Sequence, residues 1–471
     1  MPDVIIKNGT IVSASGRYQG DLVIEGEKIA AILAPGVAAQ TGVVGDREID
    51  ATGKYVVPGG IDVHTHMELP FGGTAASDTF ETGTIAAAWG GVTTIVDFAV
   101  QKTGESVVDS LAEWHHKAEG NCAVDYAFHQ IIGGVDDESL KAMRYLVENE
   151  GVTSFKLFMA YPGVFYADDG QILRAMQTAN DVGAMIMMHA ENGIAIDVLV
   201  AQALARGETD PKYHAYTRPE ELESEATHRA IQLSKVAGNV PLYIVHMSAS
   251  AALEEVAKAR HDGLNVFAET CPQYLYLSIE DHLAQPGFEG AKWVCSTPLR
   301  SKHEHHHRDL WKGLRMNELA VVSTDHCPFC FKDQKELGLG NFAAIPNGIG
   351  SVEHRMELIY QGVVAGEMSL ERWVETCSTT PARMFGLSNK GQLVPGFDAD
   401  VLVWDPNGHT SIGYGKKHHM NMDHSAWEGF EIDGKVDTVI SRGRVVVEND
   451  TFTGAKGHGR YVKRGLSEYL V

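Results

Sequence analysis

The hydrophobic residues follow one pattern at the two ends of the chain and another between them. At both ends, short apolar runs alternate with polar residues and break at turn signals such as Asn-Gly, Glu-Gly and Thr-Gly, as β-strands do. These runs cover residues 4–12, 21–33, 48–59, 399–405 and 437–450. Together they predict a small β-sandwich domain built by both chain ends, over residues 1–57 and 387–450.

Between the two ends, eight short β-rich runs alternate with longer helical stretches such as residues 138–151 and 221–238. The eight runs cover residues 59–66, 92–100, 124–132, 153–161, 184–191, 241–248, 265–271 and 320–327. Strand–helix alternation is typical of an α/β protein with a parallel sheet. Eight such strands predict a (β/α)8 TIM barrel over residues 58–386. The alternative, a doubly wound sheet, usually has fewer strands, and no G-x-G-x-x-G motif follows the first run.

Composition and charge argue against several classes of partner. The chain has 471 residues, with 39 Lys+Arg against 62 Asp+Glu and a formal net charge of −23. Nucleic acids and anionic membrane surfaces attract clustered Lys and Arg, so an acidic protein fits neither. No apolar run reaches the ~18 residues of a membrane span, and the first residues lack the pattern of a signal peptide. We therefore expect a cytoplasmic protein without nucleic-acid or membrane partners.

Residues able to bind a metal occur at or near the ends of five predicted strands. They are His64, His66, Lys156, His189, His246 and Asp325. In a TIM barrel the carboxyl ends of the strands form the catalytic face. Residues i and i+2 of a strand share a face, so His64 and His66 can reach one ion. This set predicts nitrogen and oxygen ligation of zinc, manganese, iron or cobalt.

Lys156 is a special case because it lies in the apolar run SFKLFMA. A charged lysine is costly to bury there without a partner. One interpretation is a buried ion pair. The other is that burial keeps the amine neutral, so that it adds carbon dioxide and becomes a carbamate. A carbamate could bridge two cations ~3.5–4 Å apart, the spacing of two-metal hydrolytic sites.

The order His-Thr-His, Lys, His, His, Asp on eight strands resembles the amidohydrolase superfamily. Longer motifs resemble its dihydropyrimidinases and D-hydantoinases, namely PGGIDVHTHMELPF, TSFKLFMAY, MMHAEN, YIVHMS, STDHCPF and IPNGIGSVEHRM. The flanking segment GQLVPGFDADVLVWDP also matches. The resemblance therefore covers essentially the whole chain.

The resemblance implies a site with two divalent metal ions. Its ligands would be His64 and His66 on one ion, His189 and His246 on the other, carboxylated Lys156 bridging both, and Asp325 on the first ion. Zinc is the expected metal, with manganese or cobalt as alternatives.

The same resemblance implies catalytic and substrate-binding residues. Asp325 would transfer protons, and Tyr161 would hydrogen-bond the developing oxyanion. Backbone groups of Ser296 and Asn347 would hold the imide-like face of the ring. These roles describe hydrolysis of the ring amide of 5,6-dihydropyrimidines (dihydrouracil, dihydrothymine) or 5-substituted hydantoins to N-carbamoyl amino acids.

Two alternatives remain within the resemblance. Allantoinases share the metal residues but generally lack a counterpart of Tyr161, which favours the dihydropyrimidinase or D-hydantoinase activity. Non-enzymatic dihydropyrimidinase-like scaffolds lack the metal ligands, whereas all six positions are filled here.

The segment after the fourth predicted strand departs from many family members, which often have a lysine where Pro162 stands. We expect this loop (161–170) and residues 69–74 to line the pocket for the ring substituent. Leu69, Phe71 and Phe165 would either set the size of the substituent or serve as packing residues. The family also implies a homotetramer, in which residues 451–471 would form a C-terminal arm that extends onto a neighbouring subunit.

Overall fold

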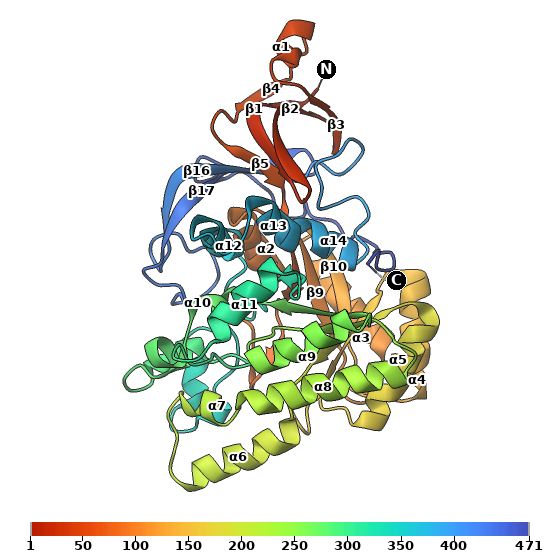
Figure 1. The fold of residues 1–471 in the computed structure, drawn as a ribbon, viewed down its shortest axis with the longest axis vertical. Coiled ribbons are helices and arrows are strands. Elements are labelled where there is room, and N and C mark those ends of the chain that lie inside the picture. The colour runs from red at the N-terminus through yellow and green to blue at the C-terminus, as the bar shows by residue number, and fades with distance from the viewer. Residues whose placement is uncertain (1, 470–471) are drawn as a thin grey trace.

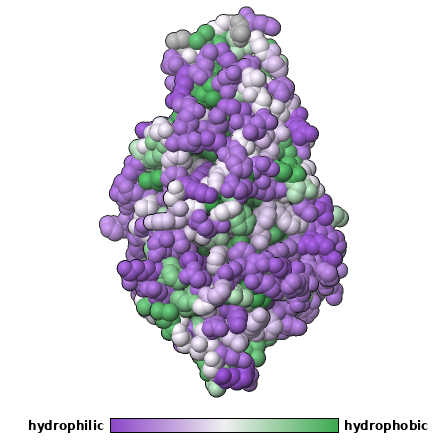
Figure 2. Space-filling model, turned by 90° about the vertical axis from the view of Figure 1, so that its left-hand side faces the viewer, coloured by the Kyte–Doolittle hydropathy of each residue, from purple (hydrophilic) through white to green (hydrophobic). Residues whose placement is uncertain are grey.

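A computed structural model describes residues 2–469. The strands from the two chain ends lie at the top of Figure 1, and a barrel surrounded by helices lies below them. Hydrophilic residues cover most of the face in Figure 2, and hydrophobic residues form small separate patches on it. Among residues 2–469, no helix combines the length and the apolar composition that crossing a membrane requires.

Eight parallel strands form the barrel. In order they are β6 (Gly60–Thr65), β9 (Val92–Val100), β10 (Asp125–Ile131), β11 (Ser154–Phe158), β12 (Met185–His189), β13 (Leu242–Ile244), β14 (Val266–Thr270) and β15 (Val321–Val322). Each pairs with the next. Just beyond β15, the His326 N–H donates to the His64 carbonyl (3.2 Å), and the His66 N–H donates to the His326 carbonyl (2.8 Å). These bonds close the ring, and the predicted TIM barrel is confirmed.

The barrel strands are buried on both faces. Every residue of β6, β9, β10, β11 and β12 is buried. Side chains alternate along a strand, so one set fills the barrel and the other packs under the helices. This explains why the runs are nearly continuous in apolar residues.

Helices connect and cover the strands. They are α2 (Phe80–Trp89), α3 (Val107–Ala118), α4 (Asp137–Tyr145), α5 (Asp169–Val182), α6 (Gly193–Ala205), α7 (Tyr213–Tyr216), α8 (Glu220–Val236), α9 (Ser250–His261), α10 (Pro272–Tyr276), α11 (His306–Arg315), α12 (Arg355–Val364), α13 (Leu370–Val374) and α14 (Thr380–Met384). Local chemistry sets their ends. In α5, for example, Asp168 and Gln171 form a capping box and Gly183 ends the helix with φ 70°.

Both chain ends contribute to a second sheet, as predicted. It runs β19-β18-β17-β16-β5-β1-β2-β3, with β4 pairing on β1. The first part comprises β1 (Val4–Ser13), β2 (Gly16–Glu25), β3 (Lys28–Leu33), β4 (Arg47–Asp50) and β5 (Tyr55–Pro58), with α1 (Val37–Thr41) inserted. The second comprises β16 (Val401–Ser411), β17 (Glu431–Ser441), β18 (Arg444–Glu448) and β19 (Thr451–Phe452). The two parts share an apolar core that includes Ile24, Val56 and Val403. The domain boundaries at 57/58 and 386/387 stay predictions.

The predicted C-terminal arm lies along the barrel of its own chain as far as residue 469. The Val462 N–H donates to the Tyr126 carbonyl (2.8 Å), beside the start of β10. The buried guanidinium of Arg464 donates to the Phe128 carbonyl (2.6 Å) and to Ser154 Oγ (2.8 Å). This segment therefore covers the amino-terminal end of the barrel. Residues 470–471 of the predicted arm lie outside the described residues.

Replacing Arg464 with Met should destabilise the chain by about 2–4 kcal/mol, because a buried carbonyl would lose its charged donor. The urea midpoint of unfolding, followed by circular dichroism, measures this loss. Arg460→Met, at an exposed position of the same segment, is the control and should leave the midpoint nearly unchanged. An unaltered midpoint for Arg464→Met would contradict the role of Arg464 in holding the segment.

Candidate metal centre

The six residues predicted to bind metal meet at one end of the barrel. They are placed by β6 and the residue after it (His64, His66), by β11 (Lys156), by β12 (His189) and by the segments after β13 (His246) and β15 (Asp325). All six are buried, and the most exposed, Asp325, retains only 9% of its accessible surface. Six polar groups buried together in this way need strong mutual partners or ions.

His64, His66 and Asp325 form the tightest group. Asp325 Oδ1 lies 3.0 Å from His64 Nε2 and 3.2 Å from His66 Nε2. Candidate ligand atoms of the three residues lie within 4.8 Å of one another. Lys156 Nζ joins the group at 2.9 Å from His64 Nε2. The strand pattern predicted this meeting of β6, β11 and the end of β15.

His189 and His246 lie directly beside this group. Their rings are 4.5 Å apart between centroids, and the His246 ring is 5.5 Å from that of His64. His66 Nδ1 and His246 Nδ1 are buried and have no hydrogen-bond partner among residues 2–469. Buried polar atoms are seldom left unpaired. The unpaired nitrogens and the clustered imidazoles therefore fit a site for metal ions.

Burial sets the charge of several of these groups. It lowers the pKa of His66 to about 3 and that of His246 well below its ordinary value. Both imidazoles are therefore neutral at physiological pH, the form that binds metals. Burial also lowers the pKa of Lys156 to about 8. No carboxylate among the described residues forms an ion pair with Lys156, and its Nζ lies 4.5 Å and 5.0 Å from the ring centroids of Phe98 and Phe158.

Glu269 supports the ligands from behind, and the sequence analysis missed it. The carboxylate, fully buried in β14, contacts His64 Nδ1. It also accepts hydrogen bonds from the Tyr243 hydroxyl (2.9 Å) and from the main-chain N–H of His246 (3.1 Å). Such partners fix the tautomer and orientation of a ligating histidine. An acidic residue inside the apolar run 265–271 was the available signal.

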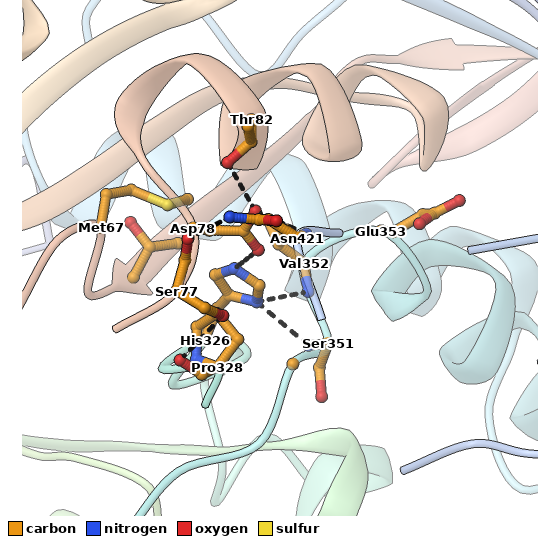
Figure 3. Close-up of polar contacts among 12 residues, drawn as sticks. Met67, Ser77, Asp78, Thr82, His326, Pro328, Ser351, Val352, Glu353 and Asn421 are labelled. Carbon is orange, nitrogen blue, oxygen red and sulfur yellow. Dashed lines mark hydrogen bonds and ion pairs between the residues drawn. The ribbon is translucent and has the colours of Figure 1, made fainter. Parts of the chain in front are cut away.

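His326 holds the chain in place next to Asp325 (Figure 3). Its Nδ1 accepts from the Ser351 N–H (3.1 Å), so its Nε2–H donates to Asp78 Oδ2 (3.0 Å). Asp78 Oδ1 in turn accepts from Thr82 Oγ1 (2.7 Å) and from the Asn421 N–H (2.9 Å). These bonds anchor the strand end that carries Asp325 to α2 and to two distant segments.

A pocket of about 450 Å³, counting solvent at its mouth, opens over the centre. Its lining residues are His66, Leu69, Phe71, Ile131, Lys156, Phe158, Tyr161, Phe165, His189, His246, Ser296, Asp325, Cys327 and Asn347. All predicted substrate-binding residues are thus brought to the centre, and only His64 of the predicted site residues is not part of the lining. Such a volume suits a small organic ligand.

One wall of the pocket is aromatic and another is polar. The rings of Phe71 and Tyr161 are 5.3 Å apart, and Phe165 stacks on Phe158 at 5.0 Å. On the polar side, Asn347 Nδ2 donates to Ser296 Oγ (3.1 Å). Burial raises the pKa of Tyr161, which keeps its hydroxyl protonated as a donor. The pocket can therefore hold a ring with a polar edge and an apolar substituent.

Three of the site residues have left-handed backbone conformations. The φ angles are 60° for Tyr161, 39° for His246 and 52° for Asp325. Non-glycine residues adopt this region at an energetic cost, and such strain is concentrated at functional sites. Each of the three follows a strand, where the chain must turn to aim the side chain at the pocket.

Comparisons with known proteins show which family this chain resembles. A model of the amidohydrolase family matches residues 55–446. A D-hydantoinase of Streptomyces coelicolor is 60% identical over 468 residues, 99% of each chain. A D-hydantoinase of Geobacillus stearothermophilus is 47% identical, over 98% of this chain and 96% of its own. The crystal structure of a dihydropyrimidinase from Brevibacillus agri superimposes with a TM-score of 0.95 at 47% identity, covering 98% of this chain and 99% of the other.

Replacing Glu269 with Gln should weaken zinc binding about 10–100-fold, because the carboxylate behind His64 would be lost. Competition with a chelator measures the affinity. Glu255→Gln is a matched control, since Glu255 contacts His228 (2.8 Å) on the surface of the molecule. Equal zinc affinity of Glu269→Gln and the wild type would show that His64 does not depend on this carboxylate.

Proposed function

The chain belongs to the amidohydrolase family, and from this premise we propose that it is a metal-dependent cyclic amidase of the D-hydantoinase and dihydropyrimidinase type. It opens the ring amide of 5-substituted hydantoins and of 5,6-dihydropyrimidines such as dihydrouracil and dihydrothymine, giving N-carbamoyl amino acids. The observation that carries the proposal is the meeting of six side chains predicted to bind metal under a pocket with a polar and an apolar wall. The full-length similarity to D-hydantoinases supports it.

The metal site that we propose holds two divalent ions. Zinc is the expected metal, and manganese and cobalt are the alternatives. The proposed ligands are His64, His66 and Asp325 on one ion, His189 and His246 on the other, and carboxylated Lys156 between them. The buried, unpaired ring nitrogens and the grouping of these side chains support this arrangement. When bound, the ions polarise the scissile carbonyl and make water nucleophilic near neutral pH.

Carboxylation is proposed for Lys156 because of its surroundings. The amine is 1% exposed, has imidazole and aromatic neighbours, and lacks an acidic partner among residues 2–469. A neutral amine there can add carbon dioxide, forming an N–C bond and releasing one proton. The product is an anion with two oxygen donors, which would replace the unfavourable buried ammonium by a metal ligand.

The remaining chemistry belongs to side chains of the pocket. Asp325 accepts the proton of the attacking water and delivers it to the ring nitrogen that leaves. Although burial alone would raise the pKa of Asp325, interaction with His64 and hydrogen bonds from both histidines lower it well below its ordinary value, so the carboxylate is ionised before the reaction begins. The protonated Tyr161 hydroxyl donates to the carbonyl oxygen as negative charge develops on it. Backbone groups of Ser296 and Asn347 hold the imide edge of the ring.

The proposed specificity follows from the apolar wall. Phe71 and Phe165 lie 6.4 Å apart and parallel, and together with Leu69 they line the pocket. They would receive the 5-substituent, and we propose the D-enantiomer because the relatives above are named D-hydantoinases.

We further propose a cytoplasmic homotetramer. Family resemblance supports this assembly, and the outer helix α6 leaves Ile194 and Val198 more than half exposed (52% and 53%). A second subunit would remove this apolar surface from water. The domain division that we propose is the one expected from the sequence, with residues 451–471 as a C-terminal arm.

The substrate range is tested by following ring opening of D- and L-5-substituted hydantoins, dihydrouracil and allantoin in the ultraviolet, with metal content measured on the same sample. D-hydantoins should react fastest, dihydrouracil should also react, and allantoin should react poorly. A faster rate with allantoin would replace the proposed activity by that of an allantoinase. A chain without metal, inactive even after addition of zinc and bicarbonate, would favour a non-enzymatic scaffold.

Lys156→Ala should abolish metal binding at the bridged site and reduce hydantoin turnover by at least about 10³-fold, as the loss of a reactive centre does. Short carboxylic acids such as acetate or propionate should restore part of the activity, since they can supply the missing bridge. Lys141→Ala, at an exposed position, is the control. Full activity of Lys156→Ala without added acid would refute the bridging role.

A further inference from the structure

Lys335 is a second fully buried lysine in the barrel domain, and the reaction described above does not use it. It begins the short 3-10 helix Lys335–Gly338 and has 0% exposure. No carboxylate among residues 2–469 forms an ion pair with it. A buried ammonium without a counter-charge is expensive, so its neighbours must compensate for the loss of water.

Three main-chain carbonyls surround the ammonium. Lys335 Nζ donates to the carbonyls of Val294 (2.9 Å), Pro346 (2.7 Å) and Gly348 (2.9 Å). An ammonium has three N–H donors and no acceptor, so the three bonds use its full capacity. Burial lowers the pKa of Lys335 to about 7, but three carbonyl acceptors favour the protonated form, because a neutral amine has only two N–H donors. Hydrogen bonds from a charged donor are stronger than those between neutral groups, which makes this junction stiff.

The three carbonyls belong to the two segments that form the polar wall of the pocket. Val294 precedes Ser296 by two residues, and Pro346 and Gly348 stand on either side of Asn347. The two segments also bond directly, because the Gly348 N–H donates to the Val294 carbonyl (2.9 Å). Lys335 therefore holds, from behind, the backbone on which Ser296 and Asn347 depend for their relative position.

We propose that Lys335 is a positioning residue for the cyclic substrate: by joining these two segments it fixes the spacing of Ser296 and Asn347 and hence the grip on the imide edge of the ring. The inference rests on the proposed function, since it assumes that this wall receives a ring amide. Lys335 itself touches no substrate and acts only through the main chain. A neutral or shorter side chain would leave carbonyls unpaired and let the two segments move apart.

This role predicts a specific kinetic change. In Lys335→Met, KM for hydantoin should rise at least about tenfold while kcat changes much less, because loss of uniform binding appears in KM. KM for a 5-substituted hydantoin should rise by the same factor, since its substituent would contact Phe71 and Phe165, which receive none of the three hydrogen bonds of Lys335. Metal content should match that of the wild type. Lys335→Arg, which keeps the charge and the donors, should show a smaller rise.

Arg464→Met is the matched control for a loss of stability alone. Arg464 is also a buried cation that donates to main-chain carbonyls, those of Phe128 and Phe385, but at the opposite end of the barrel. Its replacement should lower the melting temperature without changing KM. Equal KM shifts in Lys335→Met and Arg464→Met would overturn the inference and leave Lys335 as a purely structural residue.

The outcomes separate this inference from the proposed function. A metal-loaded wild type that turns over no cyclic amide would overturn the proposed function and this inference with it. An active wild type with unchanged KM in Lys335→Met would overturn the inference alone. If Lys335→Met does not fold, Lys335→Arg provides the test, because arginine keeps the charge but has a different geometry. A raised KM of Lys335→Arg for both hydantoins would support the inference. A KM equal to that of the wild type for both would overturn it.

Discussion

The closure of the barrel between its first and eighth strands is the constraint on which the site depends. Two main-chain hydrogen bonds of His326, to His64 and from His66, join segments from opposite ends of the barrel sequence. They place Asp325, the preceding residue, against both imidazoles. The bond from His326 to Asp78 then prevents that strand end from shifting. The candidate metal centre is thus a direct product of the same bonds that complete the fold.

Buried polar side chains surround the centre in a second layer. Glu269 orients His64, and Glu191 pairs with His189 at 2.6 Å. Such networks are favourable only when nearly all members are satisfied. The Nδ1 atoms of His66 and His246 are two of the exceptions, and both belong to imidazoles that lie beside His64. Acidic side chains therefore hold His64 and His189, while His66 and His246 each keep one ring nitrogen without a partner among residues 2–469, an arrangement that is compatible with binding an ion.

Much of the fold could be predicted because the barrel strands are buried on both faces and leave a clear apolar signal. The eight runs and the sheet from both chain ends followed from that pattern, and the candidate metal ligands followed from their places at strand ends. Tyr161, Ser296 and Asn347 came from family resemblance alone, because a residue in a loop carries no periodicity. The left-handed backbone at His246 and Asp325 had no sequence signal either, since glycine is the usual residue there. Lys335 was missed because its partners are carbonyls, which every residue possesses.

The sheet from both chain ends has a consequence for the order in which the chain can fold during synthesis. β5 pairs with β16 through Pro58 and Val401, and β1 lies on the far side of β5. Strands β1–β5 leave the ribosome first, yet they receive this partner only after the whole barrel has been made. Until then their apolar faces, including Val56, lack the residues from Val401 and Val403 that complete the core. The edge of β5 that pairs with β16 therefore stays open to mispairing until the end of the chain has been made.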